Sequence, residues 1–366
     1  MAKLIPYPET LQFREVVSYV TRYMRYTTDD GRKQMPTLQF IGTVKLHGCN
    51  TAVGYQRDIG HWYQSRNRIL TLSDDHFGFA EHMNPIGETF LTEHILSHHP
   101  VIREHYEQGN TVIVYGEWCG NNIQGEAKIA IRQIRKMFVI FKVKIIDHSS
   151  ISNRSSMNSE DKYKYRRHGF WLPPHDWNSI KWHEQSVYNI FDFPTYSIDI
   201  DFNAPELSQE TLTEITNKIE KQCPVGNYFN QNGCGEGIVW IEWDQTHGDL
   251  TFKVKGREYS VINSPSLVSI SPPKFNNIQE FIEYACTKNR MQQAFNAVLE
   301  ELQFTIDTKD FNTFLRWLVE DIIKEEKDTM NIAHIDAKDI PRGITSKAEA
   351  WFKQQLKEYR KRFRNK

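Results

Sequence analysis

The distribution of strand-like and helix-like patterns divides this chain into two parts of different character. Short runs rich in Val, Ile, Phe and Tyr dominate residues 38–147 and return in "EGIVWIEW" and "DLTFKVKG", which predicts a series of strands. Beyond residue 275 the apolar residues recur at helical spacing, as in "NNIQEFIEYA". A chain of 366 residues is long enough for two domains. We therefore expect an α+β fold, with a mixed domain over residues 1–265 followed by an all-helical domain over residues 266–366.

Several individual elements can be predicted. Helical patterns occupy "GETFLTEHILSHH", "SQETLTEITNKIEKQC" with Ser208 as N-cap, "KDFNTFLRWLVEDIIKEEKD" and the basic C-terminal segment. A polar connector containing Pro341 and Gly343 is expected between the last two of these helices. Residues 148–163 are polar and rich in Ser and Asn, which predicts a loop. Residues 264–275, with three prolines, are the expected seam between the domains.

Composition excludes several classes of protein. Apolar residues make up 39% and charged residues 25%, which is ordinary for a globular chain. No run of about 18 apolar residues is present, so no membrane span is predicted. The N-terminal "MAKLIPYPETLQF" lacks a signal-peptide core, which favours the cytoplasm. Five scattered cysteines without a C-x-x-C pair indicate neither a disulfide framework nor a zinc site.

Positive charge gathers at the C-terminus, although the formal net charge of the chain is only -1. Two glutamates, Glu349 and Glu358, oppose the basic side chains of this segment. The eight basic residues after Ser346 are Lys347, Lys353, Lys357, Arg360, Lys361, Arg362, Arg364 and Lys366. Such a cluster suits a polyanionic partner, and a solvated basic tail is an equally good interpretation of charge alone.

The heptapeptide "VKLHGCN" places a lone lysine, Lys45, inside an apolar strand-like run. Taken alone, it is best interpreted as a strand end that meets a turn; the alternative is that Lys45 is a nucleophile. A lysine amine attacks only after it has lost its proton, and its ordinary pKa is about 10.4. Burial or a neighbouring cation lowers that pKa, and the preceding "FIGTV" would supply an apolar wall.

Two further lysines, Lys253 and Lys255, alternate with apolar residues in "FKVKG". Alternation on a strand directs both side chains to the same face of the sheet. Two lysines aimed inward from one strand are costly unless anions meet them. A triphosphate would be such an anion.

Glu117 and Glu236 occupy similar positions, because each lies beside a glycine at the boundary of an apolar strand. A carboxylate there can accept a hydrogen bond from a ribose hydroxyl or from a metal-bound water. For either glutamate alone, a solvated turn acid is the better interpretation. Arg66 in "YQSRNRIL" fits a phosphate clamp and a turn cap equally well.

These residues follow one another in a specific order, and over residues 38–258 that order resembles the motif series of covalent nucleotidyltransferases. Within that superfamily the chain resembles the ATP-dependent RNA ligases of the nick-sealing branch first met in a T-even bacteriophage. His47, Gly48 and Asn50 after the lysine, together with "GEWCGNNIQG", carry this resemblance. DNA ligases usually have Asp-Gly after the lysine. The resemblance implies a nucleotidyltransferase domain with ATP-grasp-like mixed antiparallel sheets, followed by an all-α domain.

The resemblance also implies roles for the motif residues. Lys45 would form a covalent lysine-AMP, Glu117 would hold the ribose, and Asn50 would orient the adenylate phosphate. Phe141 of "FVIF" would stack on adenine, with Phe138 as a less favoured candidate.

Other implied roles concern the phosphates and the metal. Glu236 would help to bind Mg²⁺ (or Mn²⁺), and Arg66 would contact the AMP or the RNA end. Lys253 and Lys255 would contact phosphates. Gly48 would allow the backbone to approach the phosphate. His47 points to RNA ligases, and its chemical role stays open.

The implied function is that of a monomeric, ATP-dependent RNA ligase in RNA repair, which joins a 3'-hydroxyl to a 5'-phosphate through lysine-AMP and RNA-adenylate. Two alternatives stay open. One is a capping-type guanylyltransferase that uses GTP, and the other is a non-catalytic RNA-binding protein. The aromatic region 148–205 departs from the family pattern, and peripheral packing is favoured there over substrate contact.

Overall fold

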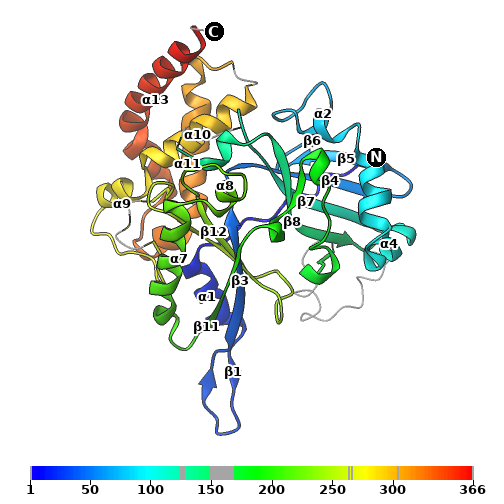
Figure 1. Cartoon of the computed structure of the whole chain (residues 1–366). Helices are drawn as coiled ribbons and strands as arrows, with labels where there is room; N and C mark the ends of the chain where they lie inside the picture. Colours follow the sequence, from blue (N-terminus) through cyan, green and yellow to red (C-terminus); the bar gives the residue numbers. More distant parts are fainter. Residues whose placement is uncertain are drawn as a thin grey trace. The chain divides into compact units, whose positions relative to one another are not determined.

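The computed structural model describes residues 2–123, 128–148, 169–262, 264, 267–302 and 305–364 (Figure 1). The chain divides into two compact units, Met1–Val254 and Lys255–Lys366. The loop expected at 148–163 lies outside the described residues except for its first, and the expected seam at 264–275 lies partly outside them. The domain boundary at 265/266 stays a prediction. No helix in the described part of the chain is long and apolar enough to cross a membrane.

The first unit contains a seven-stranded sheet whose centre is almost fully buried. Every pairing with a printed register in it is antiparallel except that of β10 with β8, which is parallel. In order across the sheet, the strands are β10 (Val187–Asn189), β8 (Met137–Ile146), β7 (Thr111–Cys119), β4 (Gly48–Gln56), β5 (Gly60–Ser65) and β6 (Ile69–Leu70), with β9 (Phe170–Trp171) also paired to β8.

A four-stranded sheet lies in the same unit, and β3 pairs with antiparallel neighbours on both sides there. A two-stranded hairpin, formed by β1 (Tyr26–Thr27) and β2 (Lys33–Gln34), precedes it. Across the four-stranded sheet, the order is β11 (Thr195–Asp201), β3 (Thr37–Lys45), β12 (Gly237–Glu242) and β13 (Thr251–Lys255). The strands predicted at "EGIVWIEW" and "DLTFKVKG" are thereby confirmed.

Helices cover the strands of the first unit. The α-helices are α1 (Phe13–Tyr23), α2 (Phe79–Met83), α3 (Gly87–Thr89), α4 (Pro100–Glu107), α7 (Gln209–Lys221) and α8 (Pro224–Tyr228), and the π-helix η1 spans Phe90–Leu96. The 3₁₀ turns are η2 (Ala130–Gln133), η4 (Pro174–Asp176), η5 (His183–Gln185), η6 (Ile190–Asp192) and η7 (Pro205–Ser208). The predicted helices at 87–99 and 208–223 are confirmed. Ser208 precedes α7, but its hydroxyl donates to the Pro205 carbonyl instead of capping the helix.

The described part of the aromatic region, residues 169–205, packs against the edges of the sheets. β9 and β10 both pair with β8, and β11 pairs with β3. Trp177 is fully buried, and its indole nitrogen donates to the Leu172 carbonyl. Asn189, also fully buried, donates to the carbonyls of Trp177 and Ile180. The preference for packing over substrate contact in this region stays a prediction.

The second unit is helical, and its core is built from aromatic and aliphatic side chains including Phe295, Phe314 and Phe352. The α+β fold with a helical C-terminal region is thereby confirmed. The helices are α9 (Ile278–Ala285), α10 (Lys288–Glu301), α11 (Phe311–Glu325), α12 (Lys327–Ile332) and α13 (Ile340–Arg364), with 3₁₀ turns η8 (Thr308–Asp310) and η9 (Ala337–Asp339).

The expected connector around Pro341 and Gly343 is wrong, because both residues lie in the first turn of α13. Proline is tolerated there, since the first backbone N–H groups of a helix have no intrahelical acceptor. Gly343 serves the packing of α13 on α9. A Cβ atom at this position would lie 2.0 Å from Cδ1 of Ile282, so only glycine allows this approach.

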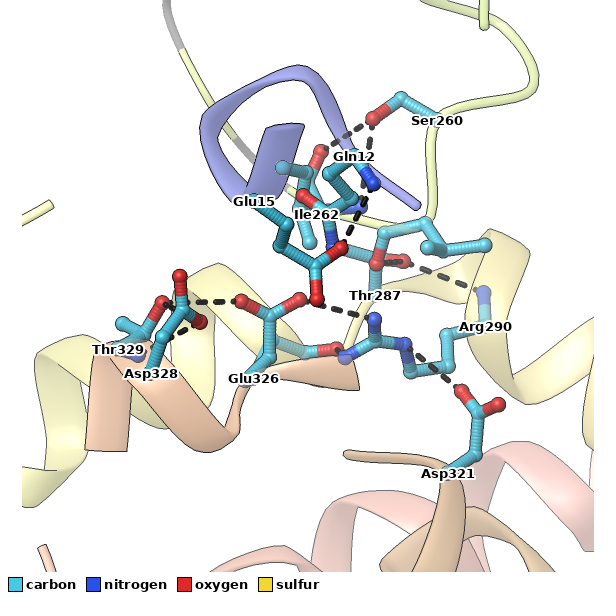
Figure 2. A network of polar contacts seen from close by, with 12 residues as sticks. Gln12, Glu15, Ser260, Ile262, Thr287, Arg290, Asp321, Glu326, Asp328 and Thr329 are labelled. Carbon is cyan, nitrogen blue, oxygen red and sulfur yellow. Dashed lines mark hydrogen bonds and ion pairs between the residues drawn. The ribbon is translucent and has the colours of Figure 1, made fainter. Parts of the chain in front are cut away.

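A buried ion network joins three helices of the second unit (Figure 2). Arg290 of α10 has no exposed side-chain surface, and its Nη2 lies 3.1 Å from Oε1 of Glu326, which is also fully buried. Its Nε lies 3.2 Å from Oδ2 of Asp321 on α11, and its Nη1 donates to the Ala285 carbonyl. Thr329 donates to the other oxygen of Glu326. The guanidinium charge is thus met by carboxylates inside the core, as buried charges require.

Candidate active site

Lys45 lies where the chain passes from one sheet of the first unit to the other. It is the last residue of β3 in the four-stranded sheet, and Gly48 is the first residue of β4 in the seven-stranded sheet. Only Leu46 and His47 separate the two strands. The lysine therefore ends an apolar strand, as the local pattern indicated, and at the same time stands at the junction of two sheets. About 22% of its side chain is exposed.

Glu236 comes to Lys45 through strand pairing. Gly237, the first residue of β12, lies opposite Lys45 in the antiparallel register of β3 and β12. The preceding residue, Glu236, is 4% exposed, and its Oε2 lies 2.8 Å from Nζ of Lys45. The same oxygen lies 3.3 Å from Nδ1 of His47. One buried carboxylate oxygen is thus shared by two nitrogen groups of the "KLHG" segment.

Glu117 approaches from the other sheet. On β7 it lies opposite Asn50 of β4, so the two side chains share one face of the seven-stranded sheet. Burial raises the pKa of Glu117 to about 7. The positive charge of Lys45 opposes this shift, the negative charge of Glu236 adds to it, and Arg66 together with the backbone N–H of Gly48 opposes it. The charges of Lys45 and Glu236 therefore both act on the Glu117 carboxyl.

Gly48 lets β4 lie against β7 beside this carboxylate. It is paired with Cys119, and a Cβ atom on it would lie 2.3 Å from the carbonyl oxygen of Trp118. The absence of a side chain permits the N–H of Gly48 to bond to Glu117. The observed close approach at this glycine is therefore to β7. Contact with a phosphate stays a prediction.

Phe141 occupies an irregularity in β8. The pairing of β7 with β8 shifts between Tyr115, which is opposite Lys142, and Gly116, which is opposite Ile140, so Phe141 has no partner in the register. Bulges of this kind re-aim side chains and are common beside active sites. The partly buried Phe141 ring packs edge-on against Tyr7 at 5.1 Å between centroids.

Phe138, the less favoured candidate for adenine stacking, lies in a different environment. It is fully buried and packs on Phe79 at 5.0 Å between ring centroids. A ring that is already enclosed by apolar side chains has no free face for a base. Of the two aromatics, Phe141 has the more accessible ring.

The remaining predicted residues are placed by their strands. Lys253 and Lys255 are partly exposed and alternate on β13 with the buried Phe252 and Val254, so the predicted common face is observed. β12 separates β13 from β3, which sets the two strands about 10 Å apart. Arg66 is exposed just after β5, and its charge acts on Glu117.

Two neighbours of this site carry no sequence signal of their own. Tyr7 precedes the strand-rich region, yet its ring packs against Tyr115 and Phe141. Lys142 follows Phe141, and a lysine inside a strand is usually solvated on one face. Here it is 1% exposed, donates to the Gly248 carbonyl at 2.6 Å, and lies 4.3 Å from the centroid of Trp171. Only the three-dimensional packing reveals either residue.

The side chains around Lys45 can be compared with what a divalent cation needs. Within the described ranges, no group of three His, Cys, Asp or Glu residues is arranged to hold a metal on protein ligands alone. Mg²⁺ at phosphoryl-transfer sites is usually held by one or two carboxylates, several waters and the substrate phosphates. The pair Glu117 and Glu236 fits a cation that arrives with phosphates.

Known structures show distant likenesses to this chain. A lysine-to-methionine mutant of Naegleria gruberi RNA ligase with AMP and Mn is 16% identical, with a TM-score of 0.40, and covers 70% of this chain. An arginine-to-alanine mutant of the same ligase with ATP and Mn is 15% identical, with a TM-score of 0.39 and the same 70% coverage. In both cases this chain spans 57% of the length of the solved protein. No curated protein matches the chain.

A comparison of the sequence with models of protein families gives a further match. The model of the RNA ligase family matches residues 38–255, which is more than half of the chain. This stretch contains Lys45, Glu117, Glu236 and the other predicted site residues, whereas Tyr7 lies before it. It ends at Lys255, the last residue of β13. The chain belongs to the RNA ligase family.

Proposed function

We propose that the chain is an ATP-dependent RNA ligase that joins an RNA 3'-hydroxyl to a 5'-phosphate in RNA repair. The observation that carries the proposal is the meeting of Lys45, Glu236 and Glu117 at the junction of two sheets. Lys45 ends β3, Glu117 lies on β7 and Glu236 immediately precedes β12, so the three residues are far apart in the sequence. An amine held by a buried carboxylate that could take up its proton is a set suited to a nucleophile that must lose its proton.

The proposed reaction has three phosphoryl-transfer steps. Nζ of Lys45 attacks the α-phosphorus of ATP, an N–P bond forms, the bond to pyrophosphate breaks, and the amine loses a proton. A 5'-phosphate oxygen of RNA then attacks the same phosphorus, which releases the lysine and yields RNA-adenylate. The RNA 3'-hydroxyl finally attacks the 5'-phosphate and expels AMP. Each step develops charge on phosphate oxygens, so electrostatic stabilisation is the main demand on the site.

The surrounding residues would divide this work among them. Glu236 would hold the Lys45 amine in place and take up the proton that the amine loses, and His47 would fix the orientation of Glu236. Glu117, whose carboxyl is half protonated near neutral pH, would bond the ribose hydroxyls, and Asn50 beside it would orient the adenylate phosphate. The bulge at Phe141 would direct its ring to the adenine.

Phosphate contacts would come from residues at the rim of the site. Lys253 and Lys255 share the partly exposed face of β13, and Arg66 is exposed near Glu117. A bound Mg²⁺ or Mn²⁺ would polarise the phosphate oxygens and neutralise the charge that develops on them. Glu236, with Glu117 near it, would hold that ion together with the ATP phosphates.

The helical unit would bind RNA through the exposed part of α13. Lys347 and Lys353 are engaged with Glu283 and Glu349, whereas Lys357, Arg360 and Lys361 are exposed. Arg362, Arg364 and Lys366 lie beyond the described side chains. Removal of residues 346–366 should lower the dependence of sealing on salt, because fewer counterions are released on binding.

Incubation with ATP or GTP labelled at the α-phosphate, followed by a denaturing gel, tests the proposed chemistry. We expect label on the protein from ATP and not from GTP. Label from GTP alone would instead support a capping-type guanylyltransferase, and no label from either would support a non-catalytic RNA-binding protein. Sealing assays on a nicked duplex, a broken tRNA loop and single-stranded ends would then identify the RNA substrate.

A further inference from the structure

The hairpin of β1 and β2 is a small, separate element of the first unit (Figure 1). It pairs Tyr26 with Gln34 and Thr27 with Lys33, and it belongs to neither larger sheet. Figure 1 shows it extending beyond the N-terminal end of β3. All four paired residues are exposed, so the hairpin buries no face of its own. It also lies outside residues 38–255, the part that matches the RNA ligase family.

An element that buries so little gains little stability from burial, because isolated two-stranded hairpins are marginal in water. Its shape is maintained by polar bonds. The backbone N–H of Thr28 donates to the Arg32 carbonyl at 2.9 Å and closes the turn. An ion pair between Arg32 and Asp30 adds to it. At its base, Asn203 bonds to both the N–H and the carbonyl of Met35. The hairpin is thus a formed and anchored projection.

The exposed side chains here combine positive charge with aromatic rings. Tyr23 and Tyr26 are 51% and 49% exposed, which places them among the most exposed large hydrophobic side chains of the described residues. Arg22 lies over the Tyr23 ring, 5.8 Å from its centroid. The hairpin and the end of α1 carry the cations Arg22, Arg25, Arg32 and Lys33 against the acids Asp29 and Asp30.

The balance of ion pairs leaves a positive surface. Asp30 is engaged by Arg32 and by the Thr28 hydroxyl. Within the described residues, no carboxylate forms an ion pair with Arg25 or Lys33, although both are exposed. In the register of the hairpin, Tyr26 is opposite Gln34 and Lys33 is opposite Thr27, so the side chains of Tyr26 and Lys33 lie on opposite faces. The hairpin therefore presents an exposed ring on one face and an exposed cation on the other. Proteins bind unpaired nucleotides with such groups, since cations meet phosphates and rings stack on bases.

The position of the hairpin relative to Lys45 decides what it can contact. β3 begins at Thr37, shortly after β2, and ends at Lys45. Eight steps of about 3.3 Å along this strand separate its two ends by roughly 26 Å. The hairpin therefore cannot touch the reacting atoms. A stacked strand rises about 3.4 Å per nucleotide, so roughly eight nucleotides cover the length of β3. The hairpin lies beyond Thr37, so eight is the smallest number that reaches it.

We propose that the hairpin surface, formed by Tyr26 on one face, Lys33 on the other, and Tyr23 and Arg25 before β1, binds an unpaired flank of the RNA that passes around the hairpin, at least about eight nucleotides from the ends that are joined. Arg25 and Lys33 contact phosphates, and the tyrosine rings stack on bases. The proposal rests on the proposed ligase function, because it takes the RNA to be the substrate held at Lys45. It adds a second RNA contact on the first unit, independent of the basic α13.

Sealing kinetics with RNA of different flanks test this surface. Three substrates are compared: one with an unpaired flank of about three nucleotides, one with an unpaired flank of about 20, and one whose longer flank is annealed to a complement. The first flank is too short to reach the hairpin from Lys45, and the second is long enough. The variants are Arg25→Ala/Lys33→Ala and Tyr26→Leu. The matched control is Lys218→Ala/Lys221→Ala, which removes two exposed lysines from α7.

With the long unpaired flank, we expect either hairpin variant to raise KM about tenfold and to leave kcat unchanged. The double variant should also reduce the slope of log affinity against log salt by about 1.5. The short flank and the control variant should show no change. The proposal would be overturned if KM rose equally with the short flank, rose only with the annealed flank, or rose equally in the control variant.

Two readouts separate this proposal from the ligase function itself. Transfer of AMP to the protein in the absence of RNA should be the same in the wild type and in the hairpin variants. If the wild type accepts no AMP, the ligase proposal fails, and direct binding of the same RNAs by filter retention still tests the hairpin. Retention of the long unpaired RNA that is unchanged in both variants would contradict the hairpin surface in either case.

Discussion

Nζ of Lys45 lies 2.8 Å from Oε2 of Glu236, although 191 positions separate the two residues in the sequence. The pairing of β3 with β12 brings them together, since Gly237 is opposite Lys45. Glu117 reaches the same place from the other sheet, and the pKa of its carboxyl is raised to about 7. The site is therefore a product of the junction between two sheets.

Glu236→Gln keeps the size of the side chain and removes its charge. We expect AMP transfer to Lys45 to fall at least about 100-fold, because the charge that holds the amine is lost. The free energy of unfolding should change by only about 1–2 kcal/mol, since Lys45 retains some contact with solvent.

Glu242→Gln, at the other end of β12, is the matched control. Glu242 is fully buried and accepts from the backbone N–H groups of Asp244, Gln245 and Thr246. Its substitution should lower the midpoint of thermal unfolding while the folded protein keeps its AMP transfer. Equal losses of AMP transfer in both variants would argue against a special role for Glu236.

Gly48→Ala tests the close contact between β4 and β7. The new methyl group would meet the Trp118 carbonyl and Cβ of Cys119, so the strands must separate. We expect a loss of about 1–3 kcal/mol in the free energy of unfolding, together with slower AMP transfer because the Gly48 bond to Glu117 lengthens. Denaturant unfolding and a gel assay measure the two effects. An unchanged unfolding midpoint would show that the strands have more room than the structure gives them.

Lys142→Met tests a dependence of stability on pH. Burial lowers the pKa of Lys142 to about 7, with Asp249 opposing the shift and Lys144 adding to it. In the unfolded chain a lysine keeps its proton up to about pH 10.4. Between pH 7 and pH 10 the unfolded state therefore binds more protons, and the free energy of unfolding should rise with pH.

The expected contribution of Lys142 is at most about 1.4 kcal/mol per pH unit within this window, and it vanishes below pH 7, where both states are protonated. Urea unfolding at a series of pH values measures it. The methionine variant should have the flatter profile, and Lys218→Met, at an exposed position of α7, should follow the wild type. Parallel profiles for wild type and Lys142→Met would contradict the buried state of this lysine.

Arg290→Met tests the ion network of the second unit (Figure 2). Removal of the guanidinium leaves the fully buried Glu326 without its arginine. Breaking a buried ion pair in this way lowers the free energy of unfolding by about 3–5 kcal/mol. Arg290→Met/Glu326→Leu should recover much of this loss, because both charges are then gone. Chemical denaturation of the whole chain, followed by tryptophan fluorescence, compares the variants. A double variant less stable than the single one would contradict the assignment.

Local features of the sequence predicted the regular elements well. The apolar periodicity of α7 and the alternation of β13 were sufficient, because they depend on neighbouring residues. Pro341 and Gly343 misled the prediction. Both residues usually end helices, but here one lies where an N–H is not needed and the other lies where Ile282 leaves no room for a side chain.

The assembly of the site could be predicted from the sequence only in part. The order of motifs indicated that Lys45, Glu117 and Glu236 act together, but pairing over 191 residues cannot be derived from local patterns. The shift in register at Phe141 and the enclosure of Lys142 depend on side chains from β7, β9 and the turn after β12. No single stretch of sequence contains that information.

The central claim is that Lys45 is the residue that carries AMP. Incubation with ATP and Mg²⁺ without RNA, followed by peptide mass spectrometry, tests it most directly, with Lys45→Arg as the matched variant. We predict one AMP on the peptide that contains Lys45, released by addition of 5'-phosphorylated RNA, and no AMP on the Lys45→Arg protein. AMP on a different lysine, or an adenylated Lys45→Arg protein, would contradict the account.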